Sequence, residues 1–412
     1  MTSVETPRRA PEPEPGREHG LGAQLRERIL SGSVLVTVLS IVLALLIGAV
    51  LIAISDPAVR DAIGYFFAAP MDTINAIWTS VSNAYWALFT GSILNPGGDN
   101  LGDVFAPLSE TVLTATPLIA CGLGVALAFR AGLFNIGAEG QLVIGALLAG
   151  YVGFAWDLPP VVHMLVAVIA GMIGGAIWAG IAGFLKARTG AHEVITTIML
   201  NYVSRFLLAY LLTVAAFHRP GRSDPISPIV DPSAQMSTPL EGLRVHTGIL
   251  FALAAAVFMW WLLERSTLGF QFRAVGANQQ AARSAGISVE RSFTVVMLIA
   301  GAFAGIAGAS QVLGTEKTLT GGIGAGIGFD AITVALLGRA KPLGTVLAGL
   351  LFGALRAGGL NMQAKTGTPI DIVVVVQSLI VLFIAAPPLV RAVFRVPARG
   401  GGMGQISKGW NG

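Results

Sequence analysis

Long apolar runs separated by short polar breaks dominate the sequence. The clearest run, residues 34–54, carries no charge and is long enough for a hydrocarbon core, which needs about 20 helical residues. Comparing the runs with their breaks predicts about ten spanning segments: 34–54, 107–128, 137–155, 161–185, 194–216, 247–263, 292–313, 326–338, 343–361 and 370–388. We therefore expect an all-α polytopic membrane protein.

Two stretches depart from this pattern. Residues 65–93 are apolar but interrupted by polar side chains, which favours an interfacial or external helix, with a full span as the alternative. The segment 326–338 is short and follows the glycine run "GGIGAGIG", which matches neither the dinucleotide nor the phosphate-loop pattern. The glycines instead predict a broken or re-entrant helix, which membranes tolerate only where protein or a water-filled cavity surrounds it.

Charge distribution predicts the domain organisation and the orientation. Residues 1–30 mix proline with both charge signs and are predicted to form a disordered tail, followed by a transmembrane domain at 31–390 and a second tail at 391–412. With both termini in the cytoplasm, 18 Lys and Arg lie on the inner side and 6 on the outer side. The positive-inside rule favours this orientation, so the polar loop 264–291 is expected in the cytoplasm.

Composition and absent motifs exclude several functions. A mean hydropathy of +0.74 is far above that of soluble domains, and the single cysteine excludes an internal disulfide framework. The sequence has no phosphate loop to hold ATP, no zinc motif, and no obvious acid, base and nucleophile set. We therefore expect a transporter without catalysis of its own, needing no cofactor or metal. Its net charge of +4 gives no reason to expect a nucleic-acid partner.

The stretch "FRAVGANQQAARSAGIS" (272–288) is polar in an otherwise apolar sequence. Asn278 is placed to cap a helix of about two turns that ends where Gly286 allows a left-handed backbone. So short a helix needs something to pack against. The residues alone leave two readings open: a surface that fits a partner's groove, or an ordinary cytoplasmic loop.

Four segments resemble the permease subunits of bacterial ABC importers, in the branch for simple sugars and nucleosides. They are 272–287, "FRAGLFNIGAEGQLVIGALLAG" (129–150), "HEVITTIMLNYV" (192–203) and "GIGFDAITVALLGRAKPLGTVLAGLLFGAL" (326–355). "NIGAEGQ" and "MLNY" look most like the nucleoside permeases. The resemblance implies a multi-pass subunit of the bacterial inner membrane, surrounded by lipid, that imports nucleosides or simple sugars by alternating access.

The same resemblance implies the partners. Two copies of an ATPase subunit, or one fused chain, would bind ATP and Mg²⁺ and hydrolyse the ATP. A second permease, expected to be a related chain and not an identical copy, and an extracytoplasmic substrate-binding lipoprotein would complete the complex. The alternative from another class is an ion-coupled secondary transporter. That alternative usually needs paired carboxylates in the membrane, whereas Glu139 and Asp330 lie in different segments.

Two sets of site residues follow from these motifs. The resemblance assigns contact with the ATPase to the loop 264–291, through Arg273, Gly276, Asn278, Ala282, Arg283 and Gly286. Its two arginines would either pair with partner carboxylates or only hold the loop inside. Polar groups at membrane depth usually face the interior of a bundle, which suggests the substrate pathway for Asn135, Glu139, Thr197, Asn201, Tyr202 and Asp330.

Each pathway residue also has a structural alternative. Thr197, Asn201 and Arg205 are spaced to share one helix face, which would provide either a polar pathway lining or hydrogen bonds between helices. Glu139 would either fix a neighbouring backbone or basic group at a gate, or stabilise a simple turn. The sequence assigns no role to Arg205 or Arg356.

Overall fold

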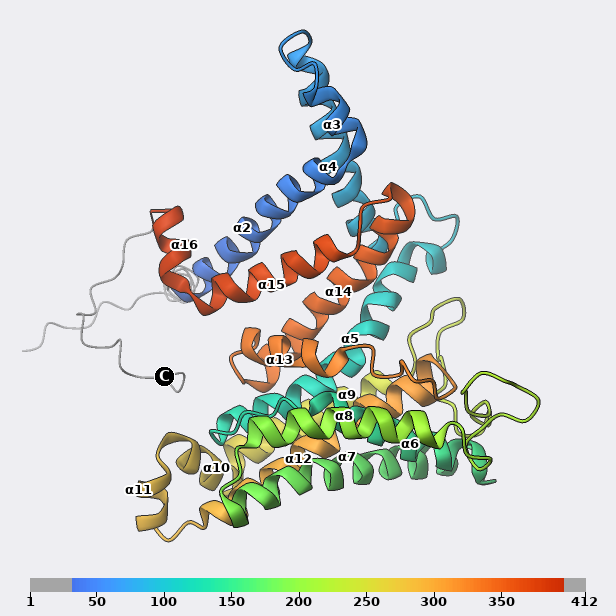
Figure 1. Ribbon diagram of the computed structural model, residues 1–412, viewed down its shortest axis with the longest axis vertical. Coiled ribbons are helices and arrows are strands. Elements are labelled where there is room, and N and C mark those ends of the chain that lie inside the picture. Colours follow the sequence, from blue (N-terminus) through green and yellow to red (C-terminus); the bar gives the residue numbers. More distant parts are fainter. Residues whose placement is uncertain (1–31, 396–412) are drawn as a thin grey trace, which may run out of the picture.

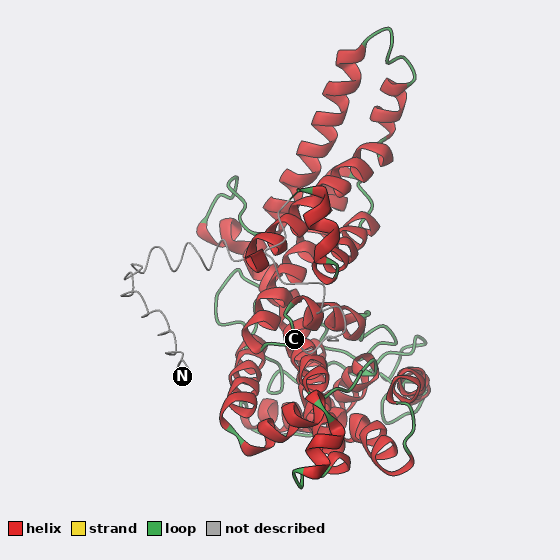
Figure 2. Cartoon of the chain, turned by 90° about the vertical axis from the view of Figure 1, so that its left-hand side faces the viewer, coloured by secondary structure: helices red, strands yellow, loops and turns green. Residues whose placement is uncertain are grey.

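A computed structural model describes residues 32–395, so most of both predicted tails lies outside the described residues. Between these limits the chain is helical, with no strand (Figure 2). The elements are α2 (Gly32–Ser55), α3 (Pro57–Ile63), α4 (Pro70–Ser92), α5 (Leu101–Arg130), α6 (Ala138–Ala155), α7 (Val162–Thr189), α8 (Glu193–Leu211), α9 (Gly248–Arg265), α10 (Thr267–Ala277), α11 (Gln279–Ser284), α12 (Val289–Ser310), the π-helix η1 (Gln311–Thr315), α13 (Ile327–Leu337), α14 (Pro342–Thr366), α15 (Asp371–Ala385) and α16 (Pro387–Val393).

Eight of the described helices are long and apolar enough to cross a membrane: α2, α5, α6, α7, α8, α9, α12 with η1, and α14. The pair α15 and α16 is bent by 96° and raises the number to nine if it forms one broken span. The all-helical prediction is confirmed, with eight or nine candidate spans instead of about ten; the bent pair is α15 and α16, whereas the sequence predicted the broken segment at 326–338. The helix α4 is not among the candidate spans.

The surplus predicted span is 326–338. Its helix α13 has 11 residues, which is too short to cross a hydrocarbon core. The glycine run before it does not continue the helix, because Ala325 and Gly326 adopt positive φ angles of 47° and 76°. The helix α8 is also shorter than predicted: it ends at Leu211, five residues before the predicted end of its span.

Small residues let the central helices approach closely. The helices α6, α7 and α12 pack against one another, and α5 packs against α12, α13 and α14 (Figure 1). A Cβ atom on Gly175 would lie 2.2 Å from the carbonyl oxygen of Gly301, so the α7 and α12 backbones touch directly. Such contacts are typical of membrane helices, where lipid gives no hydrophobic drive for association.

The helices α2, α3 and α4 form an arm at one end of the long axis (Figure 1). Asp56 caps α3 by accepting a hydrogen bond from the Ala58 amide at 2.9 Å. The C-terminal part of α4 packs on α14, where Asn361 Nδ2 donates to the Ala87 carbonyl oxygen at 2.6 Å. The arm is thereby joined to the rest of the bundle.

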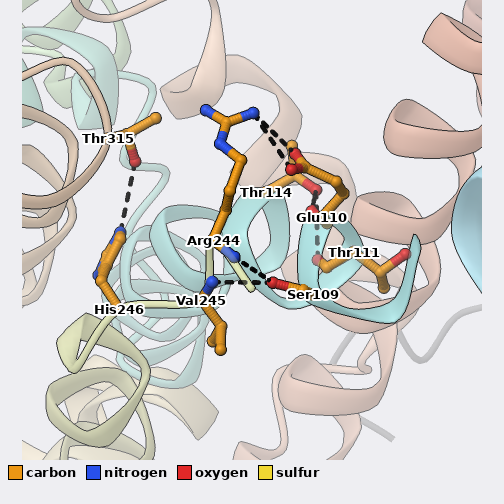
Figure 3. A network of polar contacts seen from close by, with 8 residues as sticks. All are labelled: Ser109, Glu110, Thr111, Thr114, Arg244, Val245, His246 and Thr315. Carbon is orange, nitrogen blue, oxygen red and sulfur yellow. Dashed lines mark hydrogen bonds and ion pairs between the residues drawn. The ribbon is translucent and has the colours of Figure 1, made fainter. Parts of the chain in front are cut away.

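A polar network fastens the long loop between α8 and α9 to the start of α5 (Figure 3). Ser109 Oγ accepts hydrogen bonds from the amides of Arg244 and Val245, both at 2.8 Å. The Arg244 guanidinium pairs with the Glu110 carboxylate at 3.1 Å. Next to it, His246 Nε2 lies 3.4 Å from Thr315 Oγ1, so the loop also contacts η1.

Candidate functional site

The segment 264–291 has the local structure that its sequence predicts. Asn278 Oδ1 accepts hydrogen bonds from the amides of Gln280 and Ala281 at 2.9 and 3.0 Å, which caps α11. Gly286 follows the end of α11 with a φ angle of 79°. The segment therefore folds as two short helices, α10 and α11, separated by an asparagine cap.

One face of this segment is attached to the bundle and the other is exposed. Phe272 and Ala282 are buried, with 0% and 3% of their surface exposed, whereas residues 277–281 are all exposed. The helix α10 packs on α9 and α12, and α11 lies farther out, at the edge of the molecule (Figure 1). This arrangement leaves a small, low-relief surface available to a partner.

The two arginines of the segment have different environments. Arg283 Nη2 lies 3.0 Å from Glu290 Oε1 in an ion pair whose side chains are both half exposed. Such an exposed pair contributes little to stability. Arg273 Nη1 is buried and has no hydrogen-bond partner among the described residues. Arg283 is therefore accessible from outside, whereas Arg273 points into the protein.

Gly276 places α10 directly on the connector between α5 and α6. A Cβ atom on Gly276 would lie 2.2 Å from the Arg130 carbonyl oxygen, so only glycine fits at this contact. Across the contact, Gly132 has a φ angle of 73° and lies against the Gly276 backbone. The Arg130 side chain reaches the turn between α13 and α14, where its Nε donates to the Ala340 carbonyl oxygen at 2.9 Å.

Asn135 and Gln141 form a closed pair at the start of α6. Asn135 Nδ2 donates to Gln141 Oε1 at 3.1 Å, and Gln141 Nε2 donates to Asn135 Oδ1 at 2.9 Å. The Gly137 amide also donates to Asn135 Oδ1, at 3.0 Å. Both side chains are 1% exposed. The polar groups of Asn135 and Gln141 are thus hydrogen-bonded within the connector itself, which is what a structural role would need.

Glu139 binds the N-terminus of α13. One carboxylate oxygen accepts from the Gly326 amide at 3.1 Å, and the other accepts from the Gly328 amide at 2.7 Å. The first amides of a helix have no partner within the helix, and a negative charge is favoured there. A Cβ atom on Gly328 would lie 2.1 Å from the Glu139 nitrogen, so glycine is required for this approach. Glu139 therefore fixes a neighbouring backbone, and the gate role that the sequence suggests for it stays a prediction.

The predicted polar stripe of α8 divides into two faces. Thr197 and Asn201 are buried, whereas Tyr202 is 55% exposed and Arg205 is also exposed. Asn201 Oδ1 accepts from the Gly140 amide at 2.8 Å, and its Nδ2 donates to the Ile136 carbonyl oxygen at 2.9 Å. Asn201 therefore ties α8 to the start of α6, while Arg205 has no hydrogen bond or ion pair with any described residue.

Asp330 lies on the exposed side of α13. Its Oδ2 lies 3.4 Å from Arg356 Nη1, in an ion pair whose carboxylate and guanidinium side chains are 40% and 32% exposed. Arg356 Nη2 also donates to the Ala325 carbonyl oxygen at 3.3 Å. This ion pair joins α13 to α14.

The six predicted pathway residues thus form two groups. Asn135, Glu139, Thr197 and Asn201 surround the start of α6, where a Cβ atom on Gly137 would lie 2.9 Å from Thr197 Cβ. Tyr202 lies on the exposed surface of α8, and Asp330 is half-buried in its ion pair with Arg356. Sequence reasoning missed the contact between Arg130 and Ala340, and it missed the partners of Glu139, the amides of Gly326 and Gly328. Its only signal for the last two was the glycine run itself.

Comparison with known proteins places this architecture. Residues 108–385 match the family described as "Branched-chain amino acid transport system / permease component". The chain is 43% identical to the guanosine ABC transporter permease NupP of Bacillus subtilis, over 76% of this chain and 88% of the relative. It is 36% identical to the glucose ABC transporter permease TsgB13 of Haloferax volcanii (73% and 80%) and 36% identical to the nucleoside ABC transporter permease NupB of Lactococcus lactis (68% and 79%).

No solved structure matches the chain. The family match begins within α5, ends with α15 and so includes the segment 264–291, the connector and α13. The chain belongs to the branched-chain amino acid transport system permease family, and is a multi-pass membrane subunit of an ABC importer that is not itself the ATPase.

Proposed function

We propose that this permease carries nucleosides into the cell and is driven by ATPase subunits that dock on the segment 264–291. The observation that carries the docking proposal is the construction of α10 and α11, attached on one face and exposed on the other. Arg273, Gly276, Asn278, Ala282, Arg283 and Gly286 would shape this contact. The lysine and arginine distribution supports a cytoplasmic location for the segment and for both termini.

Nucleosides are the substrate class that the comparisons favour. The relative named as a guanosine permease has the higher identity, 43%, and the motifs "NIGAEGQ" and "MLNY" point the same way. Simple sugars are the second candidate, because the relative named as a glucose permease is 36% identical. Membership of an ABC importer family decides against an ion-coupled secondary transporter.

The full complex would contain a second permease, two ATPase subunits or one fused ATPase, and a substrate-binding lipoprotein. A related chain is favoured as the second permease over a second copy of this one. Bacillus subtilis has two guanosine permeases, NupP and NupQ, which are 43% and 27% identical to this chain. ATP and Mg²⁺ would be bound by the ATPase subunits.

The substrate pathway would include Tyr202 on α8 and the half-exposed pair of Asp330 on α13 and Arg356 on α14. Tyr202 offers an aromatic ring for stacking on a base, and the Asp330–Arg356 pair offers hydrogen bonds to ribose hydroxyls. Asn135, Glu139, Thr197 and Asn201 would preserve the shape of this pathway during alternating access.

The test is uptake by the reconstituted complex of this permease, its ATPase, its second permease and its binding protein. Radiolabelled guanosine should enter proteoliposomes only with ATP, and unlabelled adenosine should compete while ribose and galactose do not. Equal competition by the sugars would overturn the nucleoside assignment. Uptake that is unchanged when residues 277–281 are replaced by a glycine–serine linker would overturn the docking proposal.

A further inference from the structure

We propose that the connector between α5 and α6, residues 130–141, transmits movement of residues 264–291, the coupling segment, to the short helix α13. Arg130 and Glu139 are the positioning residues of this link, one at each end of α13. The inference rests on the proposed function, in which the ATPase moves α10 and α11. It assigns to the connector a task that neither the family match nor the relatives' names describe.

The first step of the link is the contact between α10 and the connector. Gly276 lies on the Arg130 carbonyl group, and Gly132 lies on the Gly276 backbone, with no side chain between them. Backbone that is packed against backbone in this way has no rotamer to adjust, and protein interiors are nearly incompressible. A displacement of α10 must therefore push or pull the connector.

The second step is the attachment of α13 at both of its ends. Glu139 accepts two amides at the N-terminus of α13, at 2.7 and 3.1 Å, and Arg130 donates to the Ala340 carbonyl oxygen beyond its C-terminus, at 2.9 Å. A carboxylate at the N-terminus and a guanidinium at the C-terminus both complement the helix dipole. The connector therefore holds the whole of an 11-residue helix, about 16 Å long.

The third step is the stiffness of the connector between these attachments. The paired amides of Asn135 and Gln141 close it internally, and Asn201 binds both Ile136 and Gly140. These side chains are buried, so their hydrogen bonds are costly to break. Movement that enters at Gly132 is passed to Glu139 rather than absorbed, and α13 carries Asp330 with it.

The experiment compares uptake per ATP hydrolysed in complexes that carry Glu139→Gln, Arg130→Ala or Arg130→Lys. A glutamine presents one acceptor oxygen and an amide group that cannot accept from the second backbone amide, so one hydrogen bond is lost. For Glu139→Gln and Arg130→Ala we expect near-normal ATPase activity with uptake per ATP reduced about tenfold, the order set by one charge-assisted hydrogen bond. Arg130→Lys keeps a charged donor and should restore coupling.

Glu241→Gln is the matched control, because Glu241 is an exposed carboxylate in the loop between α8 and α9. It should leave uptake per ATP unchanged. Normal coupling in both Glu139→Gln and Arg130→Ala would overturn the inference while leaving the docking proposal intact. Loss of ATP-dependent uptake in the wild-type complex would overturn the proposed function itself.

Hydrogen exchange of the wild-type complex keeps the inference testable if the variants fail to assemble. Peptides covering 321–330 include the amides that Glu139 binds. Their exchange should change when the ATPase dimer is trapped in its closed state with nucleotide and vanadate. Exchange that stays the same while peptides covering 272–286 respond would show that movement stops at the coupling segment, and would overturn the inference.

Discussion

Replacing Asn201 by alanine separates the two roles that its sequence context allows. In the structure its side chain joins α8 to the start of α6 through the Gly140 amide and the Ile136 carbonyl. Only 9% of the residue is exposed. We therefore expect Asn201→Ala to destabilise the protein, instead of lowering transport in a complex of normal stability.

The magnitude follows from the two groups that lose their partner. A buried polar group left without a hydrogen bond costs about 1–3 kcal/mol in soluble proteins. Hydrogen bonds between membrane helices average only about 0.6 kcal/mol, because alternative partners exist in the unfolded state. Two bonds therefore give a loss of about 1–6 kcal/mol in the free energy of unfolding, with the membrane value near the lower end.

Ser204→Ala is the matched control on the same buried face of α8. Ser204 Oγ donates to the Asn201 carbonyl oxygen within its own helix at 2.8 Å, so its loss breaks no hydrogen bond between helices. Thermal unfolding in detergent, followed by the amount of assembled complex, should show a clear decrease for Asn201→Ala and little for Ser204→Ala. A variant with wild-type melting and assembly but weak uptake would refute this reasoning and favour direct contact with the solute.

Three further predictions concern the coupling segment and the opposite end of the bundle. Gly286→Val should reduce ATP-coupled uptake without loss of membrane insertion. No neighbour obstructs the new side chain, but a φ angle of 79° strains valine by about 1–2 kcal/mol. Gly286→Asn should retain uptake, because asparagine tolerates this backbone conformation. Arg283→Ala should leave the melting temperature unchanged, because the ion pair of Arg283 with Glu290 is exposed. Weaker ATPase binding in pull-down assays would show that the Arg283 guanidinium contacts the ATPase. Unchanged binding would exclude that contact. Burial, and then the nearby Lys317, lower the pKa of His246 from 6.5 to about 4, so the stability provided by the neutral ring is complete above pH 6.5 and lost as the pH falls toward 4. Melting curves across this range should show a smaller pH dependence for His246→Asn, and an equal dependence would contradict the assignment.

The coupling segment was predictable because its signals are local. An asparagine before a two-turn helix and a glycine after it determine the caps, whatever surrounds them. The span count was less predictable, because apolar composition does not show where a helix stops. For 326–338 the decisive fact is the positive φ at Ala325 and Gly326, which shortens α13 to 11 residues.

The pathway residues show a different limit. Helical spacing placed Thr197, Asn201 and Arg205 near one another around α8, but it does not say which part of that surface faces the neighbouring helices. Packing against α6 buries Thr197 and Asn201 and leaves Tyr202 and Arg205 outside. The partners of Glu139 were beyond sequence reasoning, because Gly326 and Gly328 follow it by nearly 190 residues.

Glu139 illustrates why a carboxylate at membrane depth need not mark an ion or substrate path. A helix that begins inside a membrane protein exposes amides that water cannot satisfy, and each unsatisfied amide is costly. The two-oxygen contact of Glu139 with Gly326 and Gly328 removes that cost for α13. Asp330 and Arg356, by contrast, pair side chain to side chain on an exposed face, where a polar solute can replace one partner of the pair. We therefore expect substrate selectivity in the membrane to depend on groups of the second kind, and mechanical coupling on groups of the first.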